Sequence, residues 1–167
     1  GEIPFYISSY NPNQEVNVFD EVGRLINRLK IAGISVYEIN LFSLVIEMLK
    51  ERGILDKIID KEPDLSKEKL YKTLQGAIDA QKYLIPKIEE INSSNHSNIV
   101  FLTGIGQVYP FIRSHSVLNN LQNSIKDRPT VMFFPGIYDG TSLSLFGKLK
   151  DDNYYRAFNL ETINLVK

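Results

Sequence analysis

Hydrophobic and polar positions along this chain fall into blocks that predict strands and helices in alternation. Four short apolar runs predict buried strands at residues 3–7, 34–39, 99–102 and 131–134. A further strand, at a sheet edge, is expected over residues 155–160. Strands that alternate with helices favour right-handed βαβ units. The pattern therefore predicts a single α/β domain over residues 1–167, with a mostly parallel, doubly wound (Rossmann-like) sheet and helices on both faces.

The segments between the strands carry helical periodicity. After a turn at residues 11–13, one apolar stripe predicts a helix that ends at Gly33 as its cap. The members of this stripe are Val22, Leu25, Ile26 and Leu29. Residues 41–52 are apolar on most sides, so we expect a deeply buried helix that stops at Gly53. Residues 54–65 predict a short connection with room for one helical turn.

Prolines divide the remaining helical stretches. Residues 66–92 are periodic, but Pro86 lacks an N–H and disfavours a helix interior, so we expect a break near residues 79–82. Residues 93–98 form a predicted polar loop, and Pro110 is expected in the first turn of the next helix. The sheet-facing positions of that helix are Phe111, Ser114, Leu118, Leu121 and Ile125. We expect a buried group where it meets the central strands, made of Phe101, Leu118, Leu121 and Phe133.

Composition removes several classes of function. The chain has no cysteine, which excludes a disulfide framework, a thiolate nucleophile and a cysteine-ligated metal. His96 and His115 are the only histidines, so a histidine-rich metal site is excluded too, and we expect no cofactor. The net charge of −1 gives no strongly basic surface for nucleic acid. No apolar run approaches the roughly 20 residues of a membrane span, and no signal-peptide pattern opens the chain, so we expect a cytoplasmic protein.

Candidate ligand-binding residues follow the strands, because the carboxyl ends of parallel strands gather at one edge of the sheet. We expect a cleft there formed by Asn40, Thr103, Gly104, Gly106, Gln107, Arg113, Gly136, Tyr138 and Asp139. The Gly-x-Gly turn after the third strand is typical of phosphate-binding loops. However, Tyr109 occupies the position of the third glycine in a dinucleotide fingerprint, and the chain has no Walker A sequence. A structural turn is therefore the favoured interpretation.

The polar residues of this expected cleft do not form a recognisable catalytic set. Arg113 and His115 point about 200° apart around a helix, so the two cannot easily face one ligand. Asp139 begins an Asp-Gly turn and has no second carboxylate near it in sequence, which leaves a paired acid and base unsupported. No serine lies in a nucleophile elbow. We therefore expect that this protein is not an enzyme.

Aromatic and basic residues mix in the final third of the chain. The candidates for a partner interface are Tyr138, Phe146, Lys148, Tyr154, Tyr155 and Arg156. Such a mixture can bind single-stranded nucleic acid by stacking and phosphate contact, but Asp151 and Asp152 oppose that use. Tyrosine, phenylalanine and arginine are also enriched at protein interfaces. A protein interface is the favoured interpretation.

Long stretches of the chain resemble the BrxB family of bacteriophage exclusion (BREX) defence systems. In the second half these are LTGIGQVYPFIRSH at 102–115, VLNNLQ at 117–122, PTVMFFPGIYDG at 129–140 and LKDDNYYRAF at 149–158. In the first half they are EIPFYI at 2–7, INRLK at 26–30, INLFSLVIEMLKERGIL at 39–55 and QKYLIPKI at 81–88. The resemblance implies a role in a phage-defence assembly, with PglZ, its alkaline-phosphatase-like member, as the expected partner. It also implies a short helical segment before Gly1.

The residues and the resemblance together favour a non-catalytic adaptor that binds a PglZ-type subunit. Other BREX subunits are further candidate partners, and DNA is expected to be reached only through these subunits. Two alternatives remain open. One is a small-molecule or nucleotide-binding enzyme with its site at residues 104–106 and 136–140. The other is a nucleic-acid-binding module that uses residues 148–156.

Overall fold

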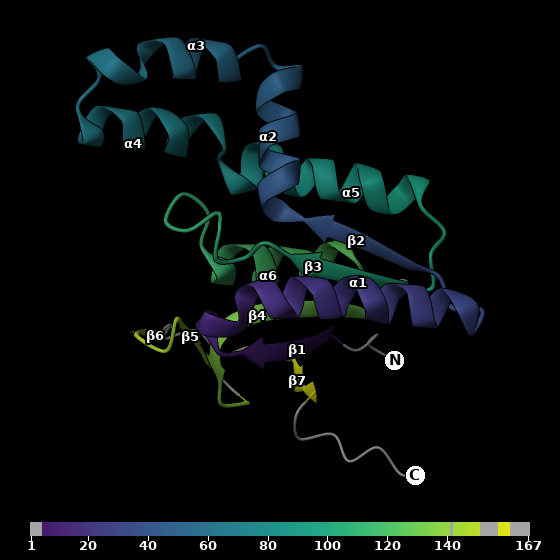
Figure 1. Ribbon diagram of the computed structural model, residues 1–167. Helices are drawn as coiled ribbons and strands as arrows, with labels where there is room; N and C mark the ends of the chain where they lie inside the picture. The colour runs from purple at the N-terminus through teal and green to yellow at the C-terminus, as the bar shows by residue number, and fades with distance from the viewer. Residues whose placement is uncertain (1–4, 141, 151–156, 161–167) are drawn as a thin grey trace.

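The main sheet has the strand order β2-β3-β4-β1-β7, and its neighbouring strands are parallel. The computed structural model describes residues 5–140, 142–150 and 157–160 (Figure 1). The sheet strands are β1 (Phe5–Tyr10), β2 (Val36–Asn40), β3 (Ile99–Thr103), β4 (Thr130–Tyr138) and β7 (Phe158–Asn159). The predicted α/β class with a mostly parallel sheet is therefore confirmed.

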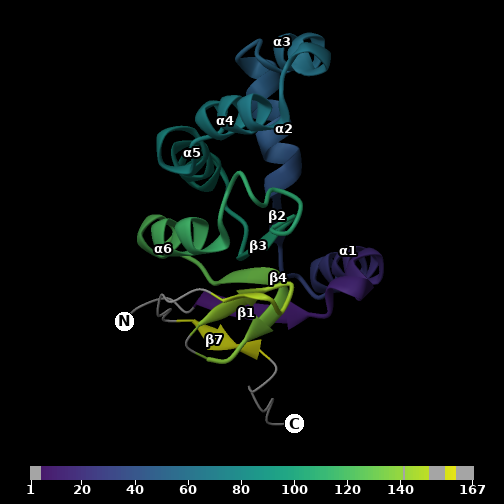
Figure 2. The same cartoon turned by 90° about the vertical axis from the view of Figure 1, so that its left-hand side faces the viewer.

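Helices cover both faces of this sheet (Figure 2). Helix α1 (Glu15–Ile31) lies on one face, and α2 (Leu41–Glu51), α5 (Ile85–Ser94) and α6 (Ser114–Ser124) pack on the other. Successive residues of β3 point to opposite faces of the sheet, and helices cover both faces, so the strand is apolar throughout. Val100 and Leu102 face the larger core under α2, α5 and α6, whereas Phe101 packs under α1.

One predicted group of core residues is divided between these two faces. Leu118 and Leu121 of α6 are fully buried, as predicted. Phe101 is buried too, but it lies under α1 with the half-buried Phe133, and the two rings pack edge to face with 5.0 Å between their centroids. The prediction that these four residues are buried together where one helix meets the central strands was wrong. Successive strand residues point to opposite faces, so Phe101 cannot join Leu102 under α6.

The predicted glycine caps are confirmed at the ends of α1 and α2. At the first cap, Gly33 has φ +84, its N–H donates to the Lys30 carbonyl, and the Ile34 N–H donates to the Leu29 carbonyl. This is the Schellman arrangement, which satisfies carbonyls that the helix itself cannot pair. The same pair of hydrogen bonds ends α2 at Gly53, where φ is +66.

The chain between α2 and α5 is more helical than predicted. Residues 54–65 form α3 (Leu55–Lys61) and a short 3-10 turn, because Leu55 and Ile58, three positions apart, both pack against the core. Helix α4 (Lys67–Ala77) follows. The predicted break is confirmed: a π-helical turn over Ala80–Leu84 separates α4 from α5, and Pro86 lies in the first turn of α5.

The predicted start of α6 at Pro110 was wrong. The helix begins at Ser114, and residues 104–113 form a loop of turns. Ile105, Val108 and Ile112 are buried beneath this loop. Burial of these side chains in the core, rather than their near-helical spacing, therefore determines where the helix begins.

Beyond the sheet, β4 continues into an antiparallel hairpin with β5 (Leu143–Leu145) and β6 (Leu149–Lys150). Leu143 and Leu145 join the core that contains Ile7 of β1. The hairpin therefore covers part of the sheet on the face opposite α1. The predicted edge strand is confirmed at β7, while residues 155 and 156 lie outside the described residues.

Candidate functional site

The turns that follow β2, β3 and β4 converge at one edge of the sheet. A Cβ atom added to Gly104 would lie 2.7 Å from Asn40 Oδ1. A Cβ added to Gly106 would lie 3.0 Å from Cγ of Pro135 and 3.2 Å from the Phe146 ring. The sequence prediction that these residues meet in space is therefore correct for these turns.

Two of the predicted cleft residues hold the fold together at this edge. Asn40 caps α2, because its Oδ1 accepts a hydrogen bond from the Ser43 N–H at 3.0 Å. Gly104 has φ +75 and leaves room for that amide. The buried Thr103 donates its hydroxyl proton to Glu38 Oε1 at 3.2 Å. Both polar side chains are engaged within the chain.

Two other candidates from the sequence face solvent. The Gln107 side chain is exposed, and its backbone N–H closes the turn by donating to the Gly104 carbonyl at 3.2 Å. Arg113 is exposed directly before α6, and its side chain does not cap the helix. The loop that carries these two residues therefore presents them outward.

The hairpin depends on Gly136 and Asp139. A Cβ on Gly136 would lie 2.2 Å from the Ser144 carbonyl oxygen, so only glycine lets β4 approach β5 so closely. Asp139 closes the next turn, since its carboxylate accepts from the Ser142 N–H at 2.7 Å and from the Ser142 hydroxyl at 3.0 Å. This is the turn role that the Asp-Gly pair also allowed.

Tyr138 is a core residue. Its side chain is 3% exposed, and its hydroxyl lies 2.7 Å from the Ala157 carbonyl oxygen and 2.9 Å from that of Gly140. Burial raises the pKa of this phenol, against a smaller lowering by the hydrogen bond to Ala157. The prediction of Tyr138 as an interface residue was wrong, because its ring fills the space between the hairpin and β7.

Phe146 occupies an unusual backbone position at the tip of the hairpin. Its φ is +56 and that of Gly147 is +72, within the three-residue connection between β5 and β6. A bulky residue with positive φ is rare. The Phe146 ring packs edge-on to Tyr109, with 6.1 Å between ring centroids, and it remains 36% exposed. Lys148 is exposed beside it, and Tyr154, Tyr155 and Arg156 lie outside the described residues.

A hollow of about 450 Å³ lies between this turn and the end of β1. Residues 9–12 line one side, and residues 136–138 with Phe146 and Gly147 line the other. It lies beyond the carboxyl ends of β1 and β4, which are neighbours in the parallel sheet.

Sequence reasoning missed Tyr10, which lines this hollow and donates its hydroxyl proton to Glu15 Oε1 at 3.3 Å. Burial, and then the charge of Glu15, raise the pKa of this tyrosine. Its place in the hollow depends on the strand order, which no motif near residue 10 reveals.

Exposed apolar side chains surround the hollow and continue along the hairpin. We call the side chains of Ile137 and Phe146 the hairpin surface; their exposed fractions are 58% and 36%. Gly147 brings the turn close to Ile137, since a Cβ there would lie 3.6 Å from Ile137 Cδ1. Successive residues of a strand point to opposite faces, so an inward-facing Tyr138 could have indicated that Ile137 points outward.

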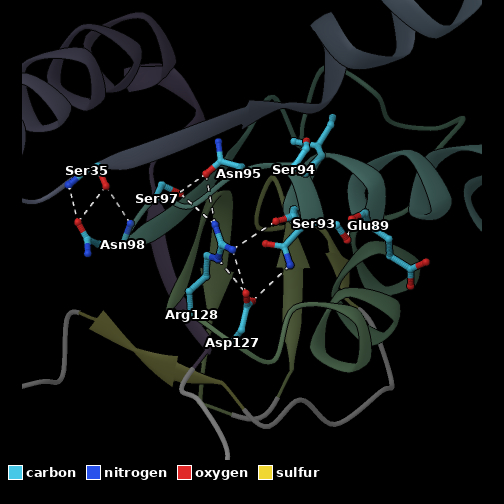
Figure 3. A network of polar contacts seen from close by, with 11 residues as sticks. Ser35, Glu89, Ser93, Ser94, Asn95, Ser97, Asn98, Asp127 and Arg128 are labelled. Atoms are coloured by element: carbon cyan, nitrogen blue, oxygen red, sulfur yellow. Dashed lines mark hydrogen bonds and ion pairs between the residues drawn. The ribbon is translucent and has the colours of Figure 1, made fainter.

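The opposite end of the sheet carries a polar network that sequence reasoning also missed (Figure 3). The Arg128 side chain is almost fully buried before β4, and its guanidinium donates to Asp127, at 2.9 Å for the shortest contact, and to Asn95, Ser97 and the Asn92 carbonyl, each at 3.3 Å. The hydrogen bond from Arg128 is the main cause that lowers the pKa of Asp127. This network ties the loop before β3 to the start of β4.

Within the described ranges, no group of three acidic or histidine side chains is placed to hold a metal ion. The helices described for this chain are all too short or too polar to cross a lipid bilayer.

The fold and this edge define an α/β protein with a parallel sheet and an apolar hairpin at the carboxyl ends of its strands. A model of the family described as BREX protein BrxB matches residues 37–160, and the chain belongs to that family. It is therefore a component of BREX phage-defence systems.

Two relatives named BREX protein BrxB support this assignment. The one from Bacillus cereus (strain H3081.97) is 42% identical over 161 residues, which are 95% of this chain and 84% of the relative. The one from Escherichia coli O9:H4 (strain HS) is 33% identical over 159 residues, which are 95% of this chain and 78% of the relative. No solved structure matches the chain.

Proposed function

We propose that this protein is a non-catalytic adaptor that binds a PglZ-type subunit of the BREX assembly through the hairpin surface. Other BREX subunits and DNA would be reached through that partner. The observation that carries the proposal is Phe146, an apolar ring held partly exposed on a backbone conformation that its side chain disfavours.

The backbone at Phe146 supports an interface role. A non-glycine residue in such a conformation costs on the order of 1–3 kcal/mol, and this strain gathers at functional sites. Asparagine or glycine would adopt the turn with less strain. Phenylalanine at this position instead supplies an aromatic ring next to the exposed Ile137, and buried aromatic anchors carry much of the energy of protein interfaces.

The polar residues at the same edge support a non-catalytic role. Asn40 caps a helix, Thr103 bonds to Glu38, and Asp139 closes a turn. A catalytic acid or base has to reach a substrate proton, whereas these three groups are directed at partners inside the chain.

The proposal is tested by binding of the purified PglZ-type subunit to Phe146→Asn. This change removes the ring and places asparagine, which tolerates a positive φ, in the turn, so the hairpin should stay folded. We expect affinity to fall about thirtyfold, since a central aromatic commonly contributes about 2 kcal/mol. Ile137→Ser on the same surface should weaken binding in the same direction.

Phe42→Asn is the matched control, because Phe42 is 43% exposed but belongs to α2. It should bind like the natural chain. Equal binding by all three variants would show that the partner uses another surface. If the natural chain fails to bind the PglZ-type subunit, the partner itself is wrong.

A second candidate is a small-molecule site in the hollow, favoured by its position at the carboxyl ends of the parallel strands β1 and β4. A nucleotide that binds there would raise the melting temperature with its concentration. Phe146→Asn should reduce that rise, because the ring lines the hollow. An unchanged melting temperature across a panel of mononucleotides and dinucleotides would rule out nucleotides as its ligands.

A further inference from the structure

Helices α3 and α4 form an arm, residues 54–78, that projects from the rest of the chain at the carboxyl-end side of the sheet (Figure 1). The arm has two junctions. At the first, Gly53 ends α2 with φ +66; at the second, Asp79 leads into the π-helical turn over Ala80–Leu84. A π-helical turn is rare and often marks a functional irregularity.

The arm is held weakly compared with its neighbours. No side chain within α3 or α4 is fully buried, whereas α2 buries five of its residues. Leu55 and Ile58 of α3 pack partly buried against the core, and Ile78, directly after α4, fixes the end of the arm in the core. The ring contact of α4 with the rest of the protein is Tyr71 against Phe111 of the loop before α6, with 5.4 Å between centroids. Regions with so few buried contacts open at low free energy.

One exposed side chain spans both junctions. Arg52 lies directly before Gly53, its guanidinium stacks 3.7 Å above the Tyr83 ring, and it donates a hydrogen bond to the Ala77 carbonyl. Ala77 is the last residue of α4, and Tyr83 lies in the π-helical turn. An arginine stacked on an aromatic ring is held by the attraction between its charge and the ring face. Arg52 therefore couples the first junction to the second.

We infer that the arm is a hinged element with two positions and that Arg52 is its latch. In the closed position Tyr71 covers Phe111, and in the open position the arm turns about Gly53 and residues 79–84, so that both rings meet solvent. Gly53 can absorb a change of φ and ψ, because glycine has no Cβ. Opening would uncover the loop of residues 104–113 at the carboxyl ends of the strands.

Hydrogen exchange of the full chain, measured by mass spectrometry, tests the hinge. We expect amides of α4 to exchange much faster than those of β3, and Arg52→Gln to speed exchange in α4 by about twofold to fivefold while β3 stays unchanged. Lys50→Gln removes a charge from the same last turn of α2 without touching the latch, and should change α4 by less than about twofold. Equal protection of α4 and β3, or equal effects of the two variants, would overturn the inference.

A distance measurement provides an independent test. The chain has no cysteine, so Lys69→Cys on α4 and Asn119→Cys on α6, both exposed, can carry the only two spin labels. Pulsed electron resonance should then show two label separations, and adding Arg52→Gln should shift the population toward the longer one. A single narrow separation that does not respond to Arg52→Gln would show that the arm is fixed.

Discussion

The two ends of the sheet use their side chains in opposite ways. At the amino ends, Arg128 is buried and its hydrogen bonds are met by neighbouring loops. At the carboxyl ends, polar side chains close turns while apolar ones such as Ile137 and Phe146 remain exposed. An exposed apolar side chain adds little to the stability of the isolated chain, whereas an unpaired buried guanidinium is costly. The difference indicates that the amino end serves the fold and that the carboxyl end is available for binding.

The largest expected effect is at the amino end. Arg128→Ala should lower the free energy of unfolding by about 3 kcal/mol, because Asn95, Ser97 and the Asn92 carbonyl lose a buried partner. Urea unfolding followed by circular dichroism measures the change. Arg113→Ala is the control at the carboxyl end, where the side chain is exposed, and should cost less than about 0.5 kcal/mol. Similar costs for the two arginines would remove the contrast between the ends.

The second effect is local to the hairpin. Gly136→Ala should destabilise β4 against β5 by about 2 kcal/mol or more, because the added Cβ would overlap the Ser144 carbonyl, 2.2 Å away. Hydrogen exchange should then rise over residues 136–149 and stay unchanged at β2 and β3. Gly140→Ala is a matched variant, because no atom lies within 4 Å of its Cβ and only its φ of +95 opposes the change. A larger loss at Gly140 would show that strain, and not close approach, governs the hairpin.

Residue patterns predicted most of the fold because local rules determine those parts. The apolar run of β3, the caps at Gly33 and Gly53 and the break before Pro86 each follow from a short window of sequence. The start of α6 does not follow from a short window of sequence, because burial of Ile105 and Val108 competes with helix periodicity there. The convergence of Asn40 with Gly104 followed from the general rule for parallel sheets.

The properties of single side chains at the site were harder to predict. Tyr138 and Phe146 are both aromatic residues in the final third, yet the first is buried and the second exposed. The difference depends on how the hairpin folds back, and no pattern near either residue reports that. Arg128 was missed for a related reason, since its partners lie 31–36 residues away in the chain.

The third prediction separates stability from binding at the carboxyl end. Phe146→Asn should stay within about 1 kcal/mol of the natural chain in urea unfolding, because relief of strain in the turn offsets the lost contact with Tyr109. Phe101→Asn, which places an amide in the core under α1, is the contrasting variant and should cost several kcal/mol. If Phe146→Asn is as destabilising as Phe101→Asn, the ring is a core residue and the hairpin surface has been wrongly assigned.

The smallest expected effect is a dependence on acid at the amino end. The hydrogen bond from Arg128 lowers the pKa of Asp127 in the folded chain, so the folded state binds that proton less readily than the unfolded state does. The resulting stabilisation is present above the ordinary aspartate pKa and is lost as the pH falls through the lower folded pKa.

Because the Asp127 carboxylate is largely exposed, solvent screens it and the effect should be modest. Asp127→Asn should therefore lower stability slightly near neutral pH and converge with the natural chain as the pH falls below the ordinary aspartate pKa of about 3.9, measured by urea unfolding at a series of pH values. Asp139→Asn serves as the comparison at the opposite end, because the Asp139 carboxylate accepts hydrogen bonds from Ser142 within a turn. A difference between Asp127→Asn and the natural chain that grows as the pH falls would show that the Arg128 network does not depend on this charge.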